Sequence, residues 1–165
     1  MQQVNHNSLC VLIRDEAVLL TMTADRPRKI TWSAIASQIT AQDSLAQKAV
    51  KEIYRLTKLT IYERDLKQAG TIHYFTIDNN HTRSETLTTT IFVCHEWQGE
   101  AINATGIRPT WFPFDQIPFN DMFDDAQSWL PKILSGDRII VEVYTKLDPT
   151  TGNETLQDVL IRSIL

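Results

Sequence analysis

The acidic side chains of residues 41–58 are the first candidates for chemistry in this sequence. The segment contains two acids, Asp43 and Glu52, and four bases, Lys48, Lys51, Arg55 and Lys58. Several carboxylates that converge from one helix can hold Mg²⁺, which prefers oxygen ligands and can neutralise phosphate charge. Bases oppose such a site, because a like charge about 4 Å away costs a few kcal/mol at an effective dielectric of about 20. The segment therefore indicates either a solvated helix face or a metal site that has lost its ligands.

The rest of the composition limits the possible functions. The chain has 165 residues, which predicts one domain spanning 1–165, and its net charge of −4 argues against nucleic acid as a partner. No apolar run reaches the roughly 20 residues that cross a membrane, and the N-terminus does not resemble a secretory signal. Cys10 and Cys94 lie in apolar runs, which predicts buried, reduced thiols and a cytoplasmic protein. No Cys/His spacing suggests zinc.

Hydrophobic periodicity predicts the elements that must position any site. Strands are expected at 8–22 (as a hairpin), 31–37, 69–77, 87–97, 108–114 and 138–147. A first helix is expected from Thr40, in a capping box with Asp43, and a second from Asp124 and Asp125 to a stop at Gly136. Residues 154–165 fit a strand or a helix equally well. The order predicts an α/β (α+β) fold with a mixed β-sheet sandwiched between helices.

Residues 108–134, "RPTWFPFDQIPFNDMFDDAQSWLPKIL", carry a specific family pattern. An Arg-Pro-x-Trp-Phe strand runs into Asp-Gln-Ile-Pro-Phe, followed by Asp-Met, an aromatic residue, acids, a Trp and a Pro. This pattern resembles the Nudix hydrolase family, and within it the branch that hydrolyses oxidised purine nucleoside triphosphates such as 8-oxo-dGTP. The resemblance implies a Nudix fold and Mg²⁺-dependent cleavage of a nucleoside triphosphate to a monophosphate and pyrophosphate.

The resemblance also implies a Nudix box, G-x5-E-x7-R-E-U-x-E-E-x-G-U with U a bulky aliphatic, at residues 37–59. The remnants of the box are Asp43, Lys51 and Glu52, whereas Ser37, Arg55, Leu56 and Lys58 replace a glycine, two glutamates and a second glycine. The acidic cluster expected before the Arg-Pro strand is also missing from "NATGI", residues 103–107. We therefore expect no metal site, and name no catalytic residue with assurance.

The base pocket of the resembled branch is better preserved. Carried over position by position, its Asn becomes Ser33, its stacking aromatic becomes Phe123, and the first acid of its acidic pair becomes Asp125. The second acid becomes Ala126, although a slide of one residue would make Asp124 and Asp125 the pair. Phe123 and the acids could equally be a core residue and helix caps.

Three functional hypotheses follow. The leading one is a catalytically inactive Nudix-fold protein that binds a purine nucleotide or a protein partner and needs no cofactor. The second is a weak Mg²⁺-dependent diphosphatase that uses Asp43, Glu52 and further acids such as Glu96 or Glu100. The third is a structural or regulatory scaffold without a ligand. Whether the protein is an enzyme is left open by the sequence, and nucleic acid and membranes are not expected partners.

Overall fold

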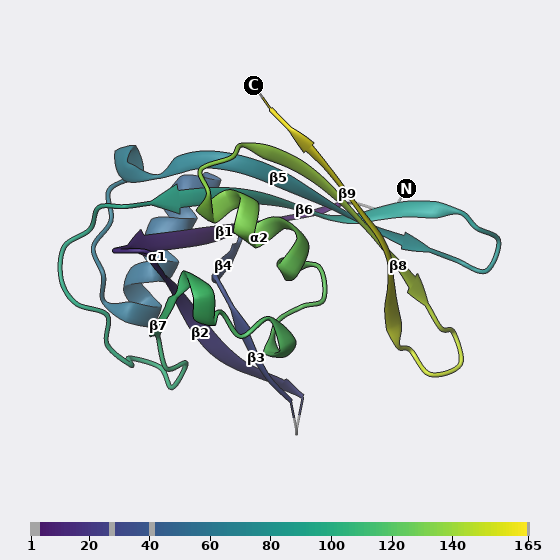
Figure 1. Ribbon diagram of the computed structural model, residues 1–165, viewed down its shortest axis with the longest axis horizontal. Helices are drawn as coiled ribbons and strands as arrows, with labels where there is room; N and C mark the ends of the chain where they lie inside the picture. Colours follow the sequence, from purple (N-terminus) through teal and green to yellow (C-terminus); the bar gives the residue numbers. More distant parts are fainter. Residues whose placement is uncertain (1–3, 27–28, 40–41, 165) are drawn as a thin grey trace.

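A curled mixed sheet forms the body of the protein, shown by a computed structural model that describes residues 4–26, 29–39 and 42–164 (Figure 1). Its main strand order is β3-β2-β1-β6-β5-β8-β9, with β4 paired to β1 and β7 paired to β2. The strands are β1 (Asn5–Arg14), β2 (Ala17–Arg26), β3 (Lys29–Ser33), β4 (Ile35–Gln38), β5 (Lys67–Ile77), β6 (Arg83–Cys94), β7 (Thr110–Pro113), β8 (Ile139–Leu147) and β9 (Glu154–Ser163). The β1–β6 and β5–β8 pairs are parallel, and the others are antiparallel.

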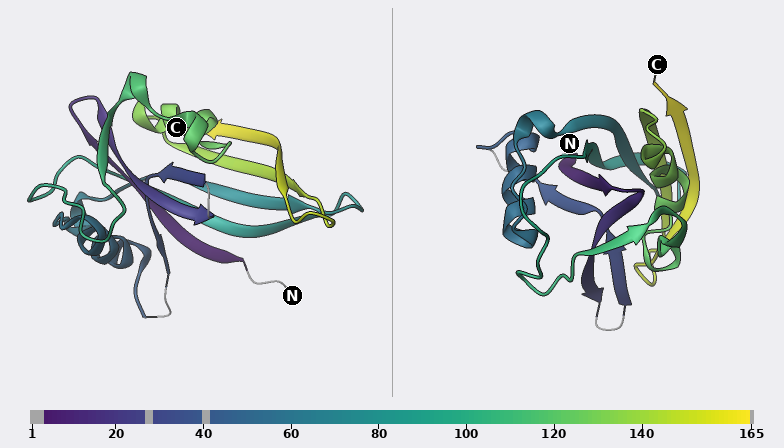
Figure 2. Two further views of the ribbon diagram at one scale, coloured as in Figure 1. Left: turned by 90° about the horizontal axis from the view of Figure 1, so that it is seen from below. Right: turned by 60° about the vertical axis from the view of Figure 1, so that its left-hand side comes forward.

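Two helices cover opposite sides of the sheet, as the two views of Figure 2 show. Helix α1 (Leu45–Thr57) packs against β1 and β4, and helix α2 (Ala126–Leu134) lies on the other face beside β8. Short 3₁₀ turns lie at Glu63–Asp65, Phe114–Gln116 and Phe119–Asp121. The predicted α+β fold, a mixed sheet between helices, is confirmed.

Strand β1 divides the core, because alternate side chains of a strand point to opposite faces. Cys10 and Leu12 belong to the cluster beneath α1, with Ala49 and Ile53 of that helix. Val11 belongs to the cluster beneath α2, which includes Trp129 and Leu130. Because α1 contributes one apolar stripe and α2 another, each helix is fixed to its own face of the sheet.

The start of helix α1 differs from the prediction. Its N-cap is Ser44, whose side-chain oxygen accepts from the Gln47 backbone N–H at 3.1 Å, while Gln47 accepts from the Ser44 N–H at 3.0 Å. This reciprocal capping box replaces the one predicted from Thr40 and Asp43; Asp43 lies before the helix, and Thr40 lies outside the described residues. A Ser with Gln three residues later satisfies two backbone donors, so the true box was readable in the sequence.

The later elements settle the remaining alternatives. Residues Glu154–Ser163 form strand β9, paired antiparallel with β8, rather than a helix. Helix α2 begins at Ala126, not at Asp124, and Gly136 follows it with a positive φ of 91°. Cys10 and Cys94 are free and buried, as predicted, and burial raises the pKa of both thiols. Among the described residues, no helix is long and apolar enough to cross a membrane.

Candidate functional site

A pocket of about 450 Å³ opens between the sheet and the segment that leads into helix α2. All four residues predicted to contact a nucleotide line it: Ser33, Phe123, Asp124 and Asp125. They come from the end of β3 and from residues 123–125, which are far apart in the chain. The other walls are contributed by Asn7 and Leu9 of β1, Trp32, Ala34, Ala36, Tyr74, Phe75, Thr76, Thr86, Leu87, Thr89, Met122, Ala126, Trp129, Leu130, Val143, Thr145, Glu154 and Leu156.

Asp125 is a buried carboxylate in this pocket. It is 7% exposed, and its Oδ2 accepts from Trp129 Nε1 at 2.8 Å and from the Tyr74 hydroxyl at 3.1 Å. It stands at the N-cap position of α2 but makes no side-chain capping bond, so capping does not explain its place. Two donors hold one oxygen of the carboxylate, which fixes its orientation and leaves it capacity to accept further hydrogen bonds.

Phe123 and Asp124 have a different environment. Phe123 is 60% exposed at the pocket wall, and Asp124 is also exposed. An exposed aromatic ring beside a cavity has a free face on which a planar ligand can stack. Ser33, at the end of β3, follows Trp32. The Trp32 ring packs edge-to-face on Phe112, with ring centroids 4.9 Å apart. The pocket therefore combines one exposed ring with one buried, oriented acceptor.

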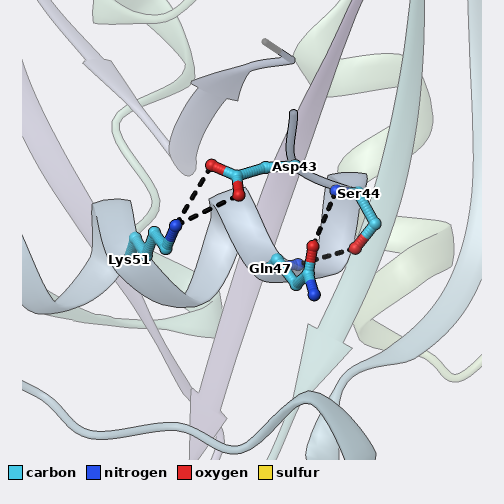
Figure 3. A network of polar contacts seen from close by, with 4 residues as sticks. All are labelled: Asp43, Ser44, Gln47 and Lys51. Carbon is cyan, nitrogen blue, oxygen red and sulfur yellow. Dashed lines mark hydrogen bonds and ion pairs between the residues drawn. The ribbon is translucent and has the colours of Figure 1, made fainter. Parts of the chain in front are cut away.

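The acids predicted as remnants of the Nudix box are held by neighbouring bases. Figure 3 shows Lys51 Nζ between both oxygens of Asp43, at 3.1 and 3.2 Å, one helical turn beyond the capping box. Arg55 Nε donates to Glu52 Oε1 at 3.0 Å, and Arg55 Nη2 contacts the same oxygen. The Glu52 side chain is 15% exposed and the Arg55 side chain 61% exposed. The hydrogen bond to Glu52 and its charge raise the pKa of Arg55, so the guanidinium stays charged.

Three residues at the expected box positions, Ser37, Leu56 and Lys58, have structural roles in this fold. Lys58 adopts a left-handed conformation, with φ 65°, at the position of the last box glycine. Left-handed backbone is the usual reason for a glycine after a helix, which supports the alignment of the box on this segment. Leu56 packs on the core cluster beneath α1, and the buried Ser37 hydroxyl lies 2.7 Å from that of Ser8. None of these three residues lines the pocket.

The donor set does not fit a Mg²⁺ ion. Within residues 4–26, 29–39 and 42–164, no group of three or more His, Cys, Asp or Glu side chains is placed to hold a metal. Asp43 and Glu52 each face a cation, and Glu100 pairs with Arg14 at 3.5 Å. Mg²⁺ requires near-octahedral oxygen ligation, and an ammonium or guanidinium beside the carboxylate competes with it. Sequence reasoning placed Arg55 at a box position but did not foresee the Lys51–Asp43 pair.

Tyr74 and Trp129 were not predicted as site residues, although both determine the orientation of Asp125. Burial, followed by the nearby charge of Asp125, raises the pKa of Tyr74, which keeps its hydroxyl a neutral donor. The alternation of β5 could have placed Tyr74 on the face of the buried Ile72. Its pairing with a residue 51 positions later could not be read from the sequence.

The architecture defines a Nudix-fold protein. A crystal structure of a MutT protein from Bacillus halodurans matches with a TM-score of 0.73 at 18% identity, covering 96% of this chain and 97% of that chain. A NUDIX hydrolase from Nitrosomonas europaea matches with a TM-score of 0.62 at 19% identity, covering 82% of this chain and 92% of that one. At these identities the likeness shows the fold.

Sequence similarity narrows the comparison to the oxidised-purine branch. An oxidized purine nucleoside triphosphate hydrolase from Danio rerio is 26% identical over 133 residues, which cover 81% of each chain. The protein of the same name from Mus musculus is 24% identical over 127 residues, covering 77% of this chain and 78% of the relative. No protein-family model matches the chain. The predicted resemblance to this branch of the Nudix hydrolases is confirmed.

Proposed function

We propose that this Nudix-fold protein is a catalytically inactive binder of a purine base or nucleotide, and that it binds without metal. The observation that carries the proposal is a contrast between the two halves of the site. The pocket around Phe123 and Asp125 is open and has an oriented acceptor. Residues 37–59, the expected Nudix box, instead hold Asp43 and Glu52 in ion pairs with bases.

The charges around the pocket favour recognition of the base over recognition of phosphate. No Lys or Arg belongs to its described lining, which includes the acids Asp124, Asp125 and Glu154. Lys51 and Arg55 of helix α1 are engaged by acids of their own. A purine edge with N–H donors can bind a buried carboxylate, whereas a phosphate in the same place would be repelled. Phosphate groups are therefore expected to add little to affinity.

The catalytic half of the proposal is tested by measuring pyrophosphate release from dGTP, 8-oxo-dGTP and ATP with Mg²⁺ or Mn²⁺. We expect no release above the background of buffer alone. Turnover near typical enzyme rates, about 1 per second or more, that is abolished by Glu52→Gln would overturn it. A matched substitution, Glu63→Gln in the exposed 3₁₀ turn, controls for the loss of one negative charge.

The binding half is tested by calorimetry in EDTA with guanosine, GMP, 8-oxo-dGMP and dGTP. We expect affinities in the range of about 1 μM to about 1 mM, similar across the phosphate series and little changed by salt. Phe123→Ala and Asp125→Asn should weaken binding, and Tyr62→Ala, an exposed aromatic outside the pocket, should not. Failure of every ligand to bind at millimolar concentration would favour a scaffold or a protein-binding role.

The alternative function is weak Mg²⁺-dependent hydrolysis, which the names of the two sequence relatives favour. It requires Glu52 to exchange Arg55 for a metal ion. Because the Arg55 side chain is largely exposed, Arg55→Gln would remove the competitor with little disturbance of the helix. Mg²⁺-dependent activity in both the parent and this variant would favour the hydrolase.

A further inference from the structure

Strand β9 leaves one edge of the sheet open. It is the last strand of the path, and no described strand pairs with its outer side (Figure 1). The segment contains neither proline nor lysine, which are two of the residues that protect such edges. The register of β9 against β8 shifts once, between the residues that pair with Tyr144 and Thr145. Residues 158–163 lie to one side of this shift and pair with β8 in a regular register. Leu160 is 48% exposed on this strand.

The backbone pattern shows which groups face outward. Ile164 N–H donates to the Arg138 carbonyl at 2.7 Å, so Ile164 directs its hydrogen-bonding groups toward β8. Because these groups alternate along a strand, Val159, Ile161 and Ser163 direct theirs away from β8. Accordingly, the Val159 N–H is hydrogen-bonded at 2.9 Å to the Asp158 side chain. The outer edge therefore offers regularly spaced backbone donors and acceptors.

A second copy of the same strand can pair with this edge in few registers. In an antiparallel pair of two copies, a residue whose backbone groups face outward must lie opposite another such residue. These residues alternate along β9, so the two-fold axis passes through a residue and not between two residues. Centring on Asp158 or Arg162 opposes like charges. Centring on Val159 sets Asp158 against Leu160, and centring on Ile161 sets Arg162 against Leu160. Each of these four registers therefore opposes like charges or a charge and an apolar side chain.

A register centred on Leu160 places compatible side chains opposite each other at each of these positions. Leu160 then meets its own copy, Val159 meets Ile161, and Asp158 meets Arg162 twice across the two-fold axis. Neither Asp158 nor Arg162 is in an ion pair within the described part of the chain. Val159 and Ile161 already pack on the core cluster beneath α2, so the pairing would continue that apolar face from one copy to the other.

We propose that the protein forms a symmetric homodimer through antiparallel pairing of β9 with β9, centred on Leu160. The Val159 N–H exchanges its bond with Asp158 for the Ile161 carbonyl of the second copy, and Asp158 pairs with Arg162 of that copy. The proposal is independent of the proposed ligand, because it uses the outer edge of β9 and not the pocket.

Sedimentation equilibrium between about 1 μM and about 1 mM tests the proposal. One chain has a mass of 18.9 kDa, and we expect a concentration-dependent rise to twice that value. Asp158→Arg and Arg162→Asp each place like charges at both contacts and should weaken the homodimer by about tenfold or more. An equimolar mixture of the two variants should restore dimerisation, because every contact then joins unlike charges.

The double variant Asp158→Arg/Arg162→Asp should also dimerise as the parent does. Lys132→Glu, a charge reversal at an exposed position of helix α2, should leave the association unchanged. A parent that stays monomeric throughout overturns the proposal, and so does a dimer that the single reversals do not weaken. Thermal unfolding of each variant checks that the variant is folded. If folded variants associate neither in the mixture nor as the double variant, the proposal is also overturned.

Discussion

At the scale of single residues, Asp124 and Asp125 are neighbours with different roles. Asp124 is exposed at the pocket wall, whereas Asp125 is buried and accepts from Trp129 and Tyr74. A buried carboxylate persists when hydrogen bonds compensate for the water that it loses. The carboxylate of Asp125 is thus part of both the pocket and the packing of α2, and the two contributions can be separated by substitution.

We expect Asp125→Ala to lower the free energy of unfolding by about 1–3 kcal/mol, because the buried Trp129 Nε1–H loses its acceptor. Asp125→Asn keeps an oxygen acceptor and should lower it by less than about 1 kcal/mol. Urea unfolding of both variants checks the difference. Asp124→Ala serves as the control and should be near neutral; an equal loss in all three variants would contradict the assignment.

At the scale of elements, helix α1 is defined by its ends and by one buried stripe. Ala49, Ile53 and Thr57 are its buried residues, and Ser44 and Lys58 cap its two ends. The bases Lys51 and Arg55 lie on its solvated side, where each pairs with an acid. Exposed pairs of this kind stabilise a protein by at most about 1 kcal/mol. The helix is therefore held mainly by its apolar stripe and its caps.

Ser44→Ala should lower the free energy of unfolding by about 1 kcal/mol, because the Gln47 backbone N–H loses the side-chain oxygen that it donates to in the capping box. Ser44→Asp retains a capping oxygen and adds a charge that the helix N-terminus favours, so it should differ from the parent by only a few tenths. Thermal unfolding compares the three proteins. A neutral Ser44→Ala would place the functional cap elsewhere.

At the scale of the whole molecule, the parallel β5–β8 pair joins the two halves of the sheet. Gly70 of β5 pairs with Ile139 of β8 and with Ile91 of β6. A Cβ at Gly70 would lie 2.3 Å from the Ile139 carbonyl oxygen, a distance that only movement of a strand could relieve. The close approach at Gly70 therefore fixes β8 and β9, which form part of the pocket wall, against β5 and the rest of the sheet.

Gly70→Ala should therefore lower the free energy of unfolding by about 1–3 kcal/mol or more, through overpacking of backbone against backbone. It should also weaken any ligand of the pocket, because β5 and β8 both line it. Thr71→Ala, the next residue of the same strand, is the control and should have a smaller effect. A Gly70→Ala protein as stable as its parent would contradict the β5–β8 register.

The sequence by itself determined the local features of this protein. Period-two and period-3.6 patterns predicted most strands and both helices, because burying one face of an element requires that spacing. The run from Arg108 to Pro131 pointed to the Nudix hydrolases. Position-by-position transfer selected Ser33, Phe123 and Asp125, and the alternative alignment slid by one residue added Asp124; all four line one pocket. The expectation that Arg55 replaces a box glutamate likewise came from the sequence alone.

Only the tertiary structure decided the features that depend on contacts between distant segments. Residues 154–163 form a strand because they pair with the edge of β8, although their own pattern fits a strand or a helix. The orientation of Asp125 depends on Tyr74, and the open edge of β9 depends on the strand order. Such pairings are invisible to a local pattern, because a side chain's periodicity specifies which face it occupies but not which partner covers that face.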